Sequence, residues 1–217
     1  MRTIKTVLQV EDNTGDARLL REMFNEHHAN EIQLLQVRRV SEAEKYLVNG
    51  TVDVILLDLR LPDADGLGAL RRLVAVAPGV PLVVLTSWDD EGIAAQALQG
   101  GAQDYLLKGQ IERRGLFRAL RHAVERKAME EALFAEKERA EVTLNSIGDA
   151  VACTDIAGNL TFLNAAAERM TGWSRQEAVG RPFAGLMRIL DASSRETIAN
   201  PTEIGRASCR ERVYGTV

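Results

Sequence analysis

An aspartate at the end of a short apolar stretch is the first residue whose position suggests chemistry. Residues 54–57 are Val-Ile-Leu-Leu, and Asp58 follows them directly, shortly before the turn-forming Pro62. A short, uninterrupted apolar run is typical of a buried strand in a parallel sheet. A carboxylate there is costly unless it is paired, hydrogen-bonded or bound to metal, so Asp58 is a candidate site residue. On this stretch alone, a helix-capping or turn aspartate remains the alternative.

Other strand-like segments also end in polar side chains. These segments are 6–10, which leads into Glu11 and Asp12, 81–87, which ends in Thr86 and Ser87, and 104–108, which ends in Lys108. A further strand is expected at 32–40, and helical patterns are found at 16–25, 41–48, 67–77 and 91–99. Strict alternation of strands and helices predicts an α/β fold with a parallel sheet covered on both faces. Ligands of such sheets bind at the carboxyl ends of the strands, where these side chains would meet.

The helix at 41–48 carries local signals for both of its ends. Ser41 and Glu44 have the spacing of a capping box, in which each side chain bonds the backbone near the other. Asn49 and Gly50 follow as a stop signal. The sequence therefore predicts that this helix caps itself.

The polar strand ends combine the residue types that phosphoryl chemistry requires. Three carboxylates can supply hard oxygen ligands to Mg²⁺, which neutralises incoming phosphoryl oxygens. A hydroxyl and an ammonium group opposite them can hold the remaining oxygens. Asp58, central in the predicted sheet, can then act as a nucleophile that forms an acyl phosphate.

At these residues the chain resembles the response-regulator receiver domain, over about residues 4–125. The resemblance implies a five-stranded, doubly wound parallel sheet of the flavodoxin type within an expected domain at 1–125. It also implies a role for each matching residue. These roles are Asp58 as phosphoacceptor and metal ligand, Glu11 and Asp12 as the acidic Mg²⁺ pair, the backbone carbonyl of Arg60 as a further metal ligand, Thr86 as the switch hydroxyl, Tyr105 as the aromatic residue that moves inward with it, and Lys108 as the cation that binds the phosphoryl group.

The sequence departs from the family pattern at two places near the site. Gly109 follows Lys108 where the family usually has a proline in a cis peptide, although glycine can still turn freely. Arg60 and Trp88 stand where the family varies the side chains that border the attacking water, and both are bulky. We therefore expect a long-lived phosphoryl group.

Composition limits the possible partners and location. With 217 residues the chain has room for one or two domains, and its net charge of −4 offers no basic face for nucleic acid. No apolar run approaches the length that spans a bilayer, and the first residues do not form a secretory signal. We expect a cytoplasmic protein that binds neither nucleic acid nor membrane. Cys153 and Cys209 do not make a disulfide framework or a zinc spacing, so they are interpreted as incidental.

A helix longer than the first domain needs is expected at 111–146. This segment contains no proline and starts with several arginines, followed by a mixed acidic stretch. Met129, Leu133, Ala140 and Ile147 recur at four- and seven-residue spacing, which favours a coiled-coil seam in a homodimer. A single solvated helix remains the alternative. His122 lacks the adjacent acidic residue of sensor-kinase phosphohistidines and is not assigned a phosphotransfer role.

Residues 147–202 resemble the opening of a PAS domain, which makes this region an incomplete α+β fragment. The resemblance rests on Asp155-x-x-Gly158-Asn159, on Asn164-x-Ala166, and on the stretch from Thr171-Gly172-Trp173 to 180–182. Two strands joined by a turn at 157–159 are expected, followed by a short helix at 165–170. The strands that would close the sheet do not fit, so no ligand pocket is expected. Residues 204–213 back-translate to codons that resemble a short-read sequencing adapter, so 203–217 are expected to be a non-native tail.

Together these features predict a two-component response regulator. A sensor histidine kinase would donate a phosphoryl group to Asp58 with Mg²⁺, and the long helix would carry the signal to a PAS and output region. We expect a homodimer through the receiver face or the long helix. We expect no catalytic activity in this chain. A parent protein with a diguanylate cyclase or phosphodiesterase output is compatible with the order of receiver, helix and PAS region. A phosphatase is disfavoured because Arg60 stands where its general acid belongs. A phosphorylation-independent docking module remains the alternative function.

Overall fold

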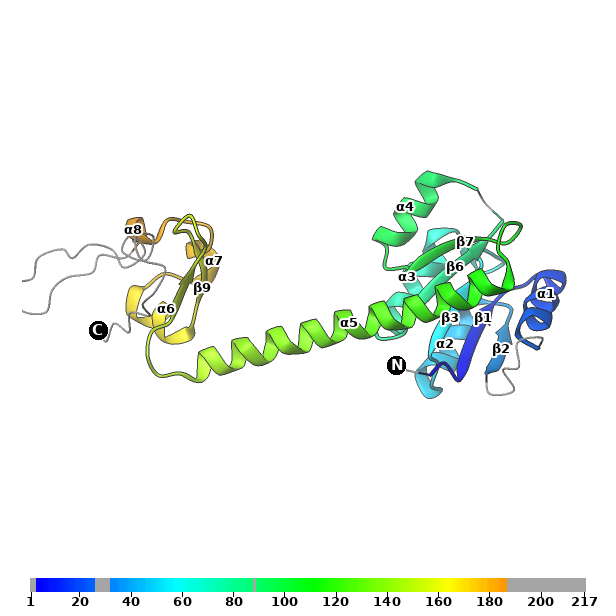
Figure 1. The fold of residues 1–217 in the computed structure, drawn as a ribbon, viewed down its shortest axis with the longest axis horizontal. Helices are drawn as coiled ribbons and strands as arrows, with labels where there is room; N and C mark the ends of the chain where they lie inside the picture. Colours follow the sequence, from blue (N-terminus) through cyan, green and yellow to red (C-terminus); the bar gives the residue numbers. More distant parts are fainter. Residues whose placement is uncertain (1–2, 26–31, 88, 187–217) are drawn as a thin grey trace, which may run out of the picture. The chain divides into compact units, whose positions relative to one another are not determined.

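A computed structural model describes residues 3–25, 32–87 and 89–186 of the chain. The chain divides into two compact units, Met1–Phe134 and Ala135–Val217. One continuous helix, α5 (Arg113–Ser146), contributes residues to both units (Figure 1). Among the described helices, none combines the length and the apolar character needed to cross a bilayer. Trp88 and the expected tail at 203–217 lie outside the described residues.

The first unit is built on a parallel sheet of five strands, as the alternation of elements predicted. The strands are β1 (Thr6–Val10), β2 (Gln33–Val37), β3 (Val54–Leu57), β6 (Leu82–Thr86) and β7 (Asp104–Leu107). They pair in the order β2-β1-β3-β6-β7, and all four pairings are parallel. Every residue of β3 and β6 is buried, which explains why both read as unbroken apolar runs. β3 is the central strand and ends directly before Asp58.

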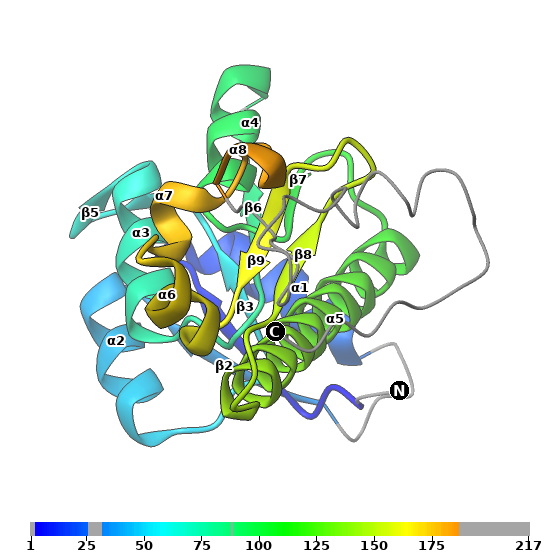
Figure 2. The ribbon, with the colours of Figure 1, turned by 90° about the vertical axis from the view of Figure 1, so that its left-hand side faces the viewer.

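Helices cover both faces of this sheet (Figure 2). One face carries α2 (Val40–Asn49), α3 (Leu67–Val76) and α4 (Glu91–Gln99), which pack on Leu8, Ile55 and Val84. The other face carries α1 (Thr14–Asn25) and the first part of α5. There the rings of Phe24 and Phe117 meet edge to face with centroids 4.8 Å apart. The alternation of side chains along each strand therefore feeds two separate cores.

The capping box predicted for α2 is wrong. The helix begins at Val40 after Arg39, and the Arg39 side chain does not cap it. Asp63, from the loop after β3, instead accepts hydrogen bonds from the backbone N–H groups of Val40 (3.0 Å) and Ser41 (2.9 Å). Although burial raises the pKa of Asp63, these backbone donors outweigh it and lower the pKa below its ordinary value. The cap is therefore supplied from a distant loop, which local spacing cannot reveal.

The loop after β3 is held at several further points. It forms a short antiparallel hairpin, β4 (Arg60–Leu61) with β5 (Ala64–Asp65), around the turn-forming Pro62. Arg72 of α3 donates a hydrogen bond to the backbone oxygen of Asp63 at 3.2 Å. It also donates to both carboxylate oxygens of Glu44 at 2.8 and 2.6 Å. Gly66, at the start of α3, has a φ of 46°, which favours glycine. These bonds fix the segment that follows Asp58.

The second unit contains a short antiparallel pair and three short helices. They are β8 (Ala152–Thr154), β9 (Leu160–Leu163), α6 (Ala165–Thr171), α7 (Arg175–Ala178) and α8 (Phe183–Leu186). The two predicted strands and the turn between them are confirmed, with Gly158 at a φ of 85°. Leu160, Leu163 and Ala167 form a small buried core with Trp173 against it.

A buried asparagine joins α5 to the rest of the second unit. The Asn164 side-chain oxygen accepts from the backbone N–H groups of Val151 (2.9 Å) and Ala167 (2.8 Å). Its amide nitrogen donates to the backbone oxygens of Leu144 (3.0 Å) and Asp149 (2.9 Å). Four bonds from one fully buried side chain therefore hold the last turn of α5, β8 and α6 together.

Gln9 in β1 is a buried amide whose nitrogen and oxygen both lack a hydrogen-bond partner among the described residues. An unsatisfied buried polar group costs about 1–3 kcal/mol, so the nearly isosteric Gln9→Met should raise the free energy of unfolding by about that amount. Urea denaturation of the full chain measures this change. Gln33→Met, at an exposed glutamine of the neighbouring strand β2, is the matched control and should gain nothing. A loss of stability in Gln9→Met would contradict the interpretation of Gln9 as an unsatisfied group.

Candidate functional site

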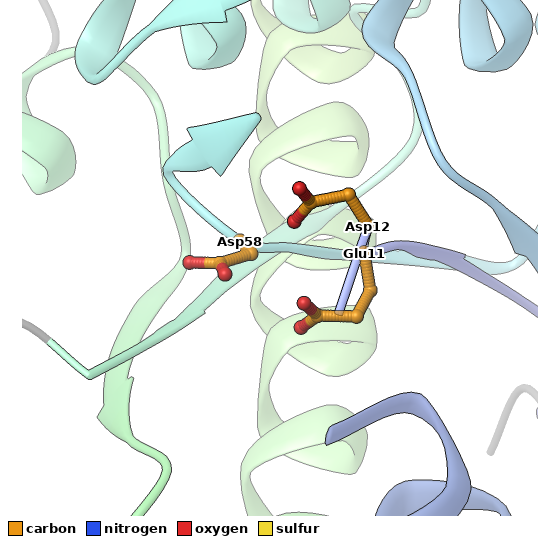
Figure 3. A group of neighbouring side chains, drawn as sticks. All are labelled: Glu11, Asp12 and Asp58. Carbon is orange, nitrogen blue, oxygen red and sulfur yellow. The ribbon is translucent and has the colours of Figure 1, made fainter. Parts of the chain in front are cut away.

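Three carboxylates meet at the carboxyl end of the central strands. Glu11 and Asp12 follow β1, and Asp58 follows β3 (Figure 3). Backbone bonds continue past the strands, with Glu11 N–H on the Val37 oxygen at 2.9 Å and Asp58 N–H on the Val10 oxygen at 3.0 Å. One oxygen from each of the three carboxylates lies within 4.8 Å of the others. The sheet register therefore brings together the acids that the sequence predicted would meet.

Lys108 reaches into this cluster from the end of β7. Its Nζ lies 2.8 Å from Asp58 Oδ2, 2.5 Å from Glu11 Oε2 and 2.8 Å from Asp16 Oδ2. Glu11 and Asp58 are almost fully buried, at 2% and 3% exposure, and the lysine side chain is 11% exposed. The ammonium group thus compensates two buried carboxylates at once, as buried charges require.

The pKa values of Glu11 and Lys108 both depend on burial and on their hydrogen bonds, but a different effect dominates in each. Burial raises the pKa of Glu11 above its ordinary value, and the hydrogen bond and charge of Lys108 only partly offset this. Burial alone would lower the pKa of Lys108, but its hydrogen bonds to Asp16, Asp58 and Glu11 outweigh burial and raise it. Lys108 therefore stays positively charged at neutral pH.

The donor set suits a hard divalent cation. The three acids offer carboxylate oxygens as ligands, and at this separation they match the ligands that Mg²⁺ takes in proteins. The backbone N–H of Arg60 donates to Asp58 Oδ1 at 3.3 Å, which holds that peptide beside the acid. Glu11, Asp12 and Asp58 would hold the cation, which supplies positive charge against phosphoryl oxygens when bound. The backbone carbonyl of Arg60 remains a predicted further ligand.

The hydroxyl side of the site comes from β6 and the residue after it. Thr86 ends β6 beside β3 and is fully buried. Ser87 follows, and its hydroxyl accepts a hydrogen bond from the Arg60 guanidinium. Tyr105 lies half-buried on β7, where burial and then the charges of Asp90, Asp89 and Asp58 raise its pKa. The described residues contain no cis peptide bond, the Lys108–Gly109 bond included.

Asp16 is a site residue that the sequence analysis missed, because it was considered only as the start of a helix. Asn13 caps α1, its side-chain oxygen accepting from the backbone N–H groups of Gly15 (2.8 Å) and Asp16 (3.3 Å). This cap starts the helix at Thr14 and puts the Asp16 carboxylate in its first turn, next to Lys108. The cap was readable from the sequence, but the lysine lies 92 positions away.

Comparison with known families agrees with this geometry. The model of the response regulator receiver domain matches residues 7–121, which is 115 of the 217 residues. The chain belongs to the response regulator receiver family. A second model, the PAS fold, matches residues 138–213. The receiver is therefore followed by a PAS domain, and this match begins within α5 and extends past the described residues.

Curated relatives are similar to parts of this chain in sequence. The chain is 45% identical over 82 residues to "Probable diguanylate cyclase DgcE" of Escherichia coli (strain K12), which is 38% of this chain and 7% of the relative. It is 38% identical over 112 residues to the methanogenesis regulatory protein FilR1 of Methanothrix harundinacea (strain 6Ac), which is 47% of this chain and 23% of the relative. The chain thus spans less than a quarter of the length of either relative.

Solved structures confirm the receiver fold. The signal receiver domain of a modulated diguanylate cyclase from Desulfovibrio desulfuricans G20 superposes with a TM-score of 0.51 at 26% identity, covering 59% of this chain and 99% of that one. The signal receiver domain of an HD domain-containing protein from Pseudomonas fluorescens Pf-5 gives a TM-score of 0.52 at 24% identity, covering 58% and 99%. The predicted flavodoxin-like receiver fold is therefore confirmed.

Removing the lysine should expose how far the buried acids depend on it. Lys108→Met removes the ammonium group and leaves Glu11 and Asp58 buried without a positively charged partner. Breaking a buried ion pair from one side costs about 3–5 kcal/mol. We expect a loss of this size in EDTA, and we expect Mg²⁺ to restore more stability to the variant than to the unsubstituted chain. Urea denaturation with EDTA or with MgCl₂ measures both effects. Lys45→Met, at an exposed lysine of α2, is the control, and an equal result for the two variants would refute the expected dependence on Lys108.

Proposed function

We propose that this chain is the phosphoryl-accepting and relay part of a two-component response regulator. The observation that carries the proposal is the contact of Lys108 Nζ with Asp58 at 2.8 Å, beside carboxylates within 4.8 Å of one another. A buried carboxylate, a cation and an acidic metal site together are the parts that phosphoryl transfer to an aspartate needs. The donor would be the phosphohistidine of a sensor histidine kinase.

The transfer step assigns one task to each residue. An Asp58 oxygen forms a bond to phosphorus while the phosphorus–nitrogen bond of the donor histidine breaks, and the imidazole leaves and takes up a proton. The ammonium group of Lys108 and the hydroxyl of Thr86 would hold two oxygens of the transferred group. Glu11, Asp12, Asp58 and the backbone carbonyl of Arg60 would hold Mg²⁺, which would supply positive charge against the oxygens of the phosphoryl group.

The switch would pass from the site into α5. Phosphorylation adds charge at Asp58, and we infer that Thr86 and Tyr105 move toward it. Tyr105 lies on β7, and the backbone N–H of Ile111 bonds the Leu107 oxygen at 3.1 Å just before α5 begins. A displacement of β7 therefore has a short covalent and hydrogen-bonded route to the long helix.

The later part of α5 is fixed to the second unit by its own contacts. Beside the Asn164 bonds, Glu141 of α5 pairs with Arg175 of α7 at 3.0 Å. The guanidinium group of Arg175 also lies 4.5 Å from the centre of the Phe162 ring on β9. These contacts support a relay in which α5 delivers the signal to the PAS region. We assign residues 1–125 to the receiver, 111–146 to the connecting helix and 147–202 to a partial PAS domain.

Two surfaces support a homodimer as the signalling form. A groove of about 920 Å³ lies between β7 and α5, lined among others by Tyr105, Arg118 and His122. Along α5, Met129 and Leu133 expose 70% and 69% of their surface. Apolar side chains exposed at this spacing favour pairing with a second helix over a solvated helix. We therefore propose dimerisation through the receiver face or α5.

The proposed output lies in a longer protein. Receiver and PAS domains are non-catalytic signalling modules, so this chain would switch an output and would not catalyse one itself. The likeness to a diguanylate cyclase and to the receiver of another supports an output that makes or degrades a cyclic dinucleotide. We propose a cytoplasmic location, where a sensor kinase can reach Asp58, and no nucleic-acid or membrane partner for this part of the chain.

A docking module that works without phosphorylation is the second candidate. It is favoured by one observation, which is that the Lys108 ammonium group pairs with both Glu11 and Asp58. A site satisfied in this way is stable as it stands. Incubation with a small phosphodonor separates the two candidates, because only the first accepts a phosphoryl group on Asp58.

Phosphoryl acceptance can be measured by the intact mass of the chain after incubation with Mg²⁺ and acetyl phosphate. We expect the addition of one phosphoryl group, because Asp58 is the carboxylate in contact with Lys108. The adduct should be absent in Asp58→Asn and after chelation by EDTA. If the folded, unsubstituted chain gains no mass, the docking module becomes the better account.

The lifetime of that adduct tests the role of Arg60. Its guanidinium group contacts Ser87 at the rim of the site, where it would obstruct the water that hydrolyses an acyl phosphate. We expect a half-life above about a minute for the unsubstituted chain and a shorter one for Arg60→Ser, since water exclusion protects reactive intermediates. Loss of adduct mass over time gives both values. Arg71→Ser, at an exposed arginine of α3, is the control, and a half-life unaffected by Arg60→Ser would show that this side chain does not shield the site.

A further inference from the structure

Lys108 contacts three carboxylates, and only two of them belong to the acidic metal set. An ammonium group has three N–H donors, and Lys108 directs one to Glu11 at the end of β1, one to Asp58 at the end of β3 and one to Asp16 in the first turn of α1. All its donors are therefore used. Two of the acceptors, Glu11 and Asp58, also belong to the acidic metal set, whereas Asp16 does not.

A cation and the lysine compete for the same two acids. Both oxygens of Glu11 already accept hydrogen bonds, one from Lys108 and one from the backbone N–H of Asn13 at 3.0 Å. Both oxygens of Asp58 do so too, one from Lys108 and one from the backbone N–H of Arg60 at 3.3 Å. A divalent cation that binds these acids shares their negative charge with Lys108 and repels the ammonium group, and both effects weaken the hold of the lysine on them.

Asp16 can remain bonded to Lys108 when a cation binds Glu11 and Asp58. Its carboxylate is 34% exposed and lies on the α1 side of Lys108, anchored by the Asn13 cap. A small cavity of about 20 Å³ adjoins both side chains and is otherwise lined by apolar residues, among them Leu20 and Ile111. Space beside the Lys108–Asp16 pair is therefore present on the α1 side, where the lysine can stay bonded to Asp16 as it leaves the other two acids.

We propose that Asp16 is a positioning residue, the metal-independent anchor that holds Lys108 beside Asp58 while a divalent cation takes Glu11 and Asp58. It lowers the cost of displacing the lysine and keeps its ammonium group within reach of Asp58. The part of this inference that concerns phosphoryl transfer rests on the proposed function. The part that concerns cation binding does not.

A double-mutant cycle on Mg²⁺ binding tests the anchor without any phosphoryl donor. Calorimetric titration with Mg²⁺ compares the unsubstituted chain, Asp16→Asn, Lys108→Met and the double variant. Loss of a charge-assisted bond that receives the lysine should weaken Mg²⁺ binding about tenfold in Asp16→Asn. In the Lys108→Met background the same substitution should change binding less than about twofold, since only a screened charge is lost.

The cycle separates an anchor from a general effect of charge. Equal weakening in both backgrounds, or no weakening in either, would overturn the proposal, because Asp16 would then act on the cation without the lysine or not at all. Glu22→Gln removes one carboxylate from the same helix at an exposed ion pair with Arg18 and should leave Mg²⁺ binding unchanged. Asp16→Glu keeps the charge and should restore most of the affinity. Lys108→Gln provides a second lysine-free background, in which the small effect of Asp16→Asn must recur.

The rate of phosphorylation gives an independent reading. At saturating Mg²⁺ and acetyl phosphate, Asp16→Asn should slow formation of the Asp58 adduct about tenfold, because the lysine is no longer held beside the acceptor. An unchanged rate would overturn the positioning role in transfer. If even the unsubstituted chain forms no adduct, the proposed function fails, while the Mg²⁺ cycle still decides whether Asp16 anchors Lys108.

Discussion

The ion cluster of Lys108 is the interaction on which the first unit depends. Two nearly fully buried carboxylates at the edge of an apolar sheet are stable only beside a positive charge. This charge comes from the end of β7, which lies two strands away from β3 in the sheet, and it reaches Asp58 at 2.8 Å. The same cluster that stabilises the fold is therefore the one a metal and a phosphoryl group would rearrange. The proposed switch would therefore use the same side chains that stabilise the buried acids.

The cluster is bordered on one side by a hydrogen-bonded loop and on the other by a small cavity. Behind Asp58, the loop is fixed by the Asp63 cap on α2 and by Arg72, which bonds Asp63 and Glu44 together. On the other side, the lysine adjoins a small cavity, and β7 leads directly into α5. The hydrogen bonds to the loop therefore tie the α2 and α3 side of the cluster more firmly than the side of the small cavity.

Helix α5 packs into the core of the first unit and is held in the second unit by hydrogen bonds and an ion pair. Its first turns are buried through residues such as Leu116 and Leu120, which pack against the sheet. Farther along, Met129 and Leu133 are exposed, and the last turn is held by Asn164 in the second unit. The helix is therefore anchored at both ends by different kinds of contact, apolar packing in the first unit and polar bonds in the second.

By itself, the sequence determined the five strands, their parallel arrangement, the acids and the lysine at their ends, and the PAS-like hairpin. These follow from local patterns, together with the rule that the carboxyl ends of parallel strands share one edge. Only the tertiary structure decided that Asp63 caps α2 in place of Ser41, and that Asp16 completes the partners of Lys108. Both contacts join segments distant in the chain, and spacing along the sequence carries no information about which side chains of different elements touch. Elements are encoded locally, but the pairing of charges depends on how those elements pack.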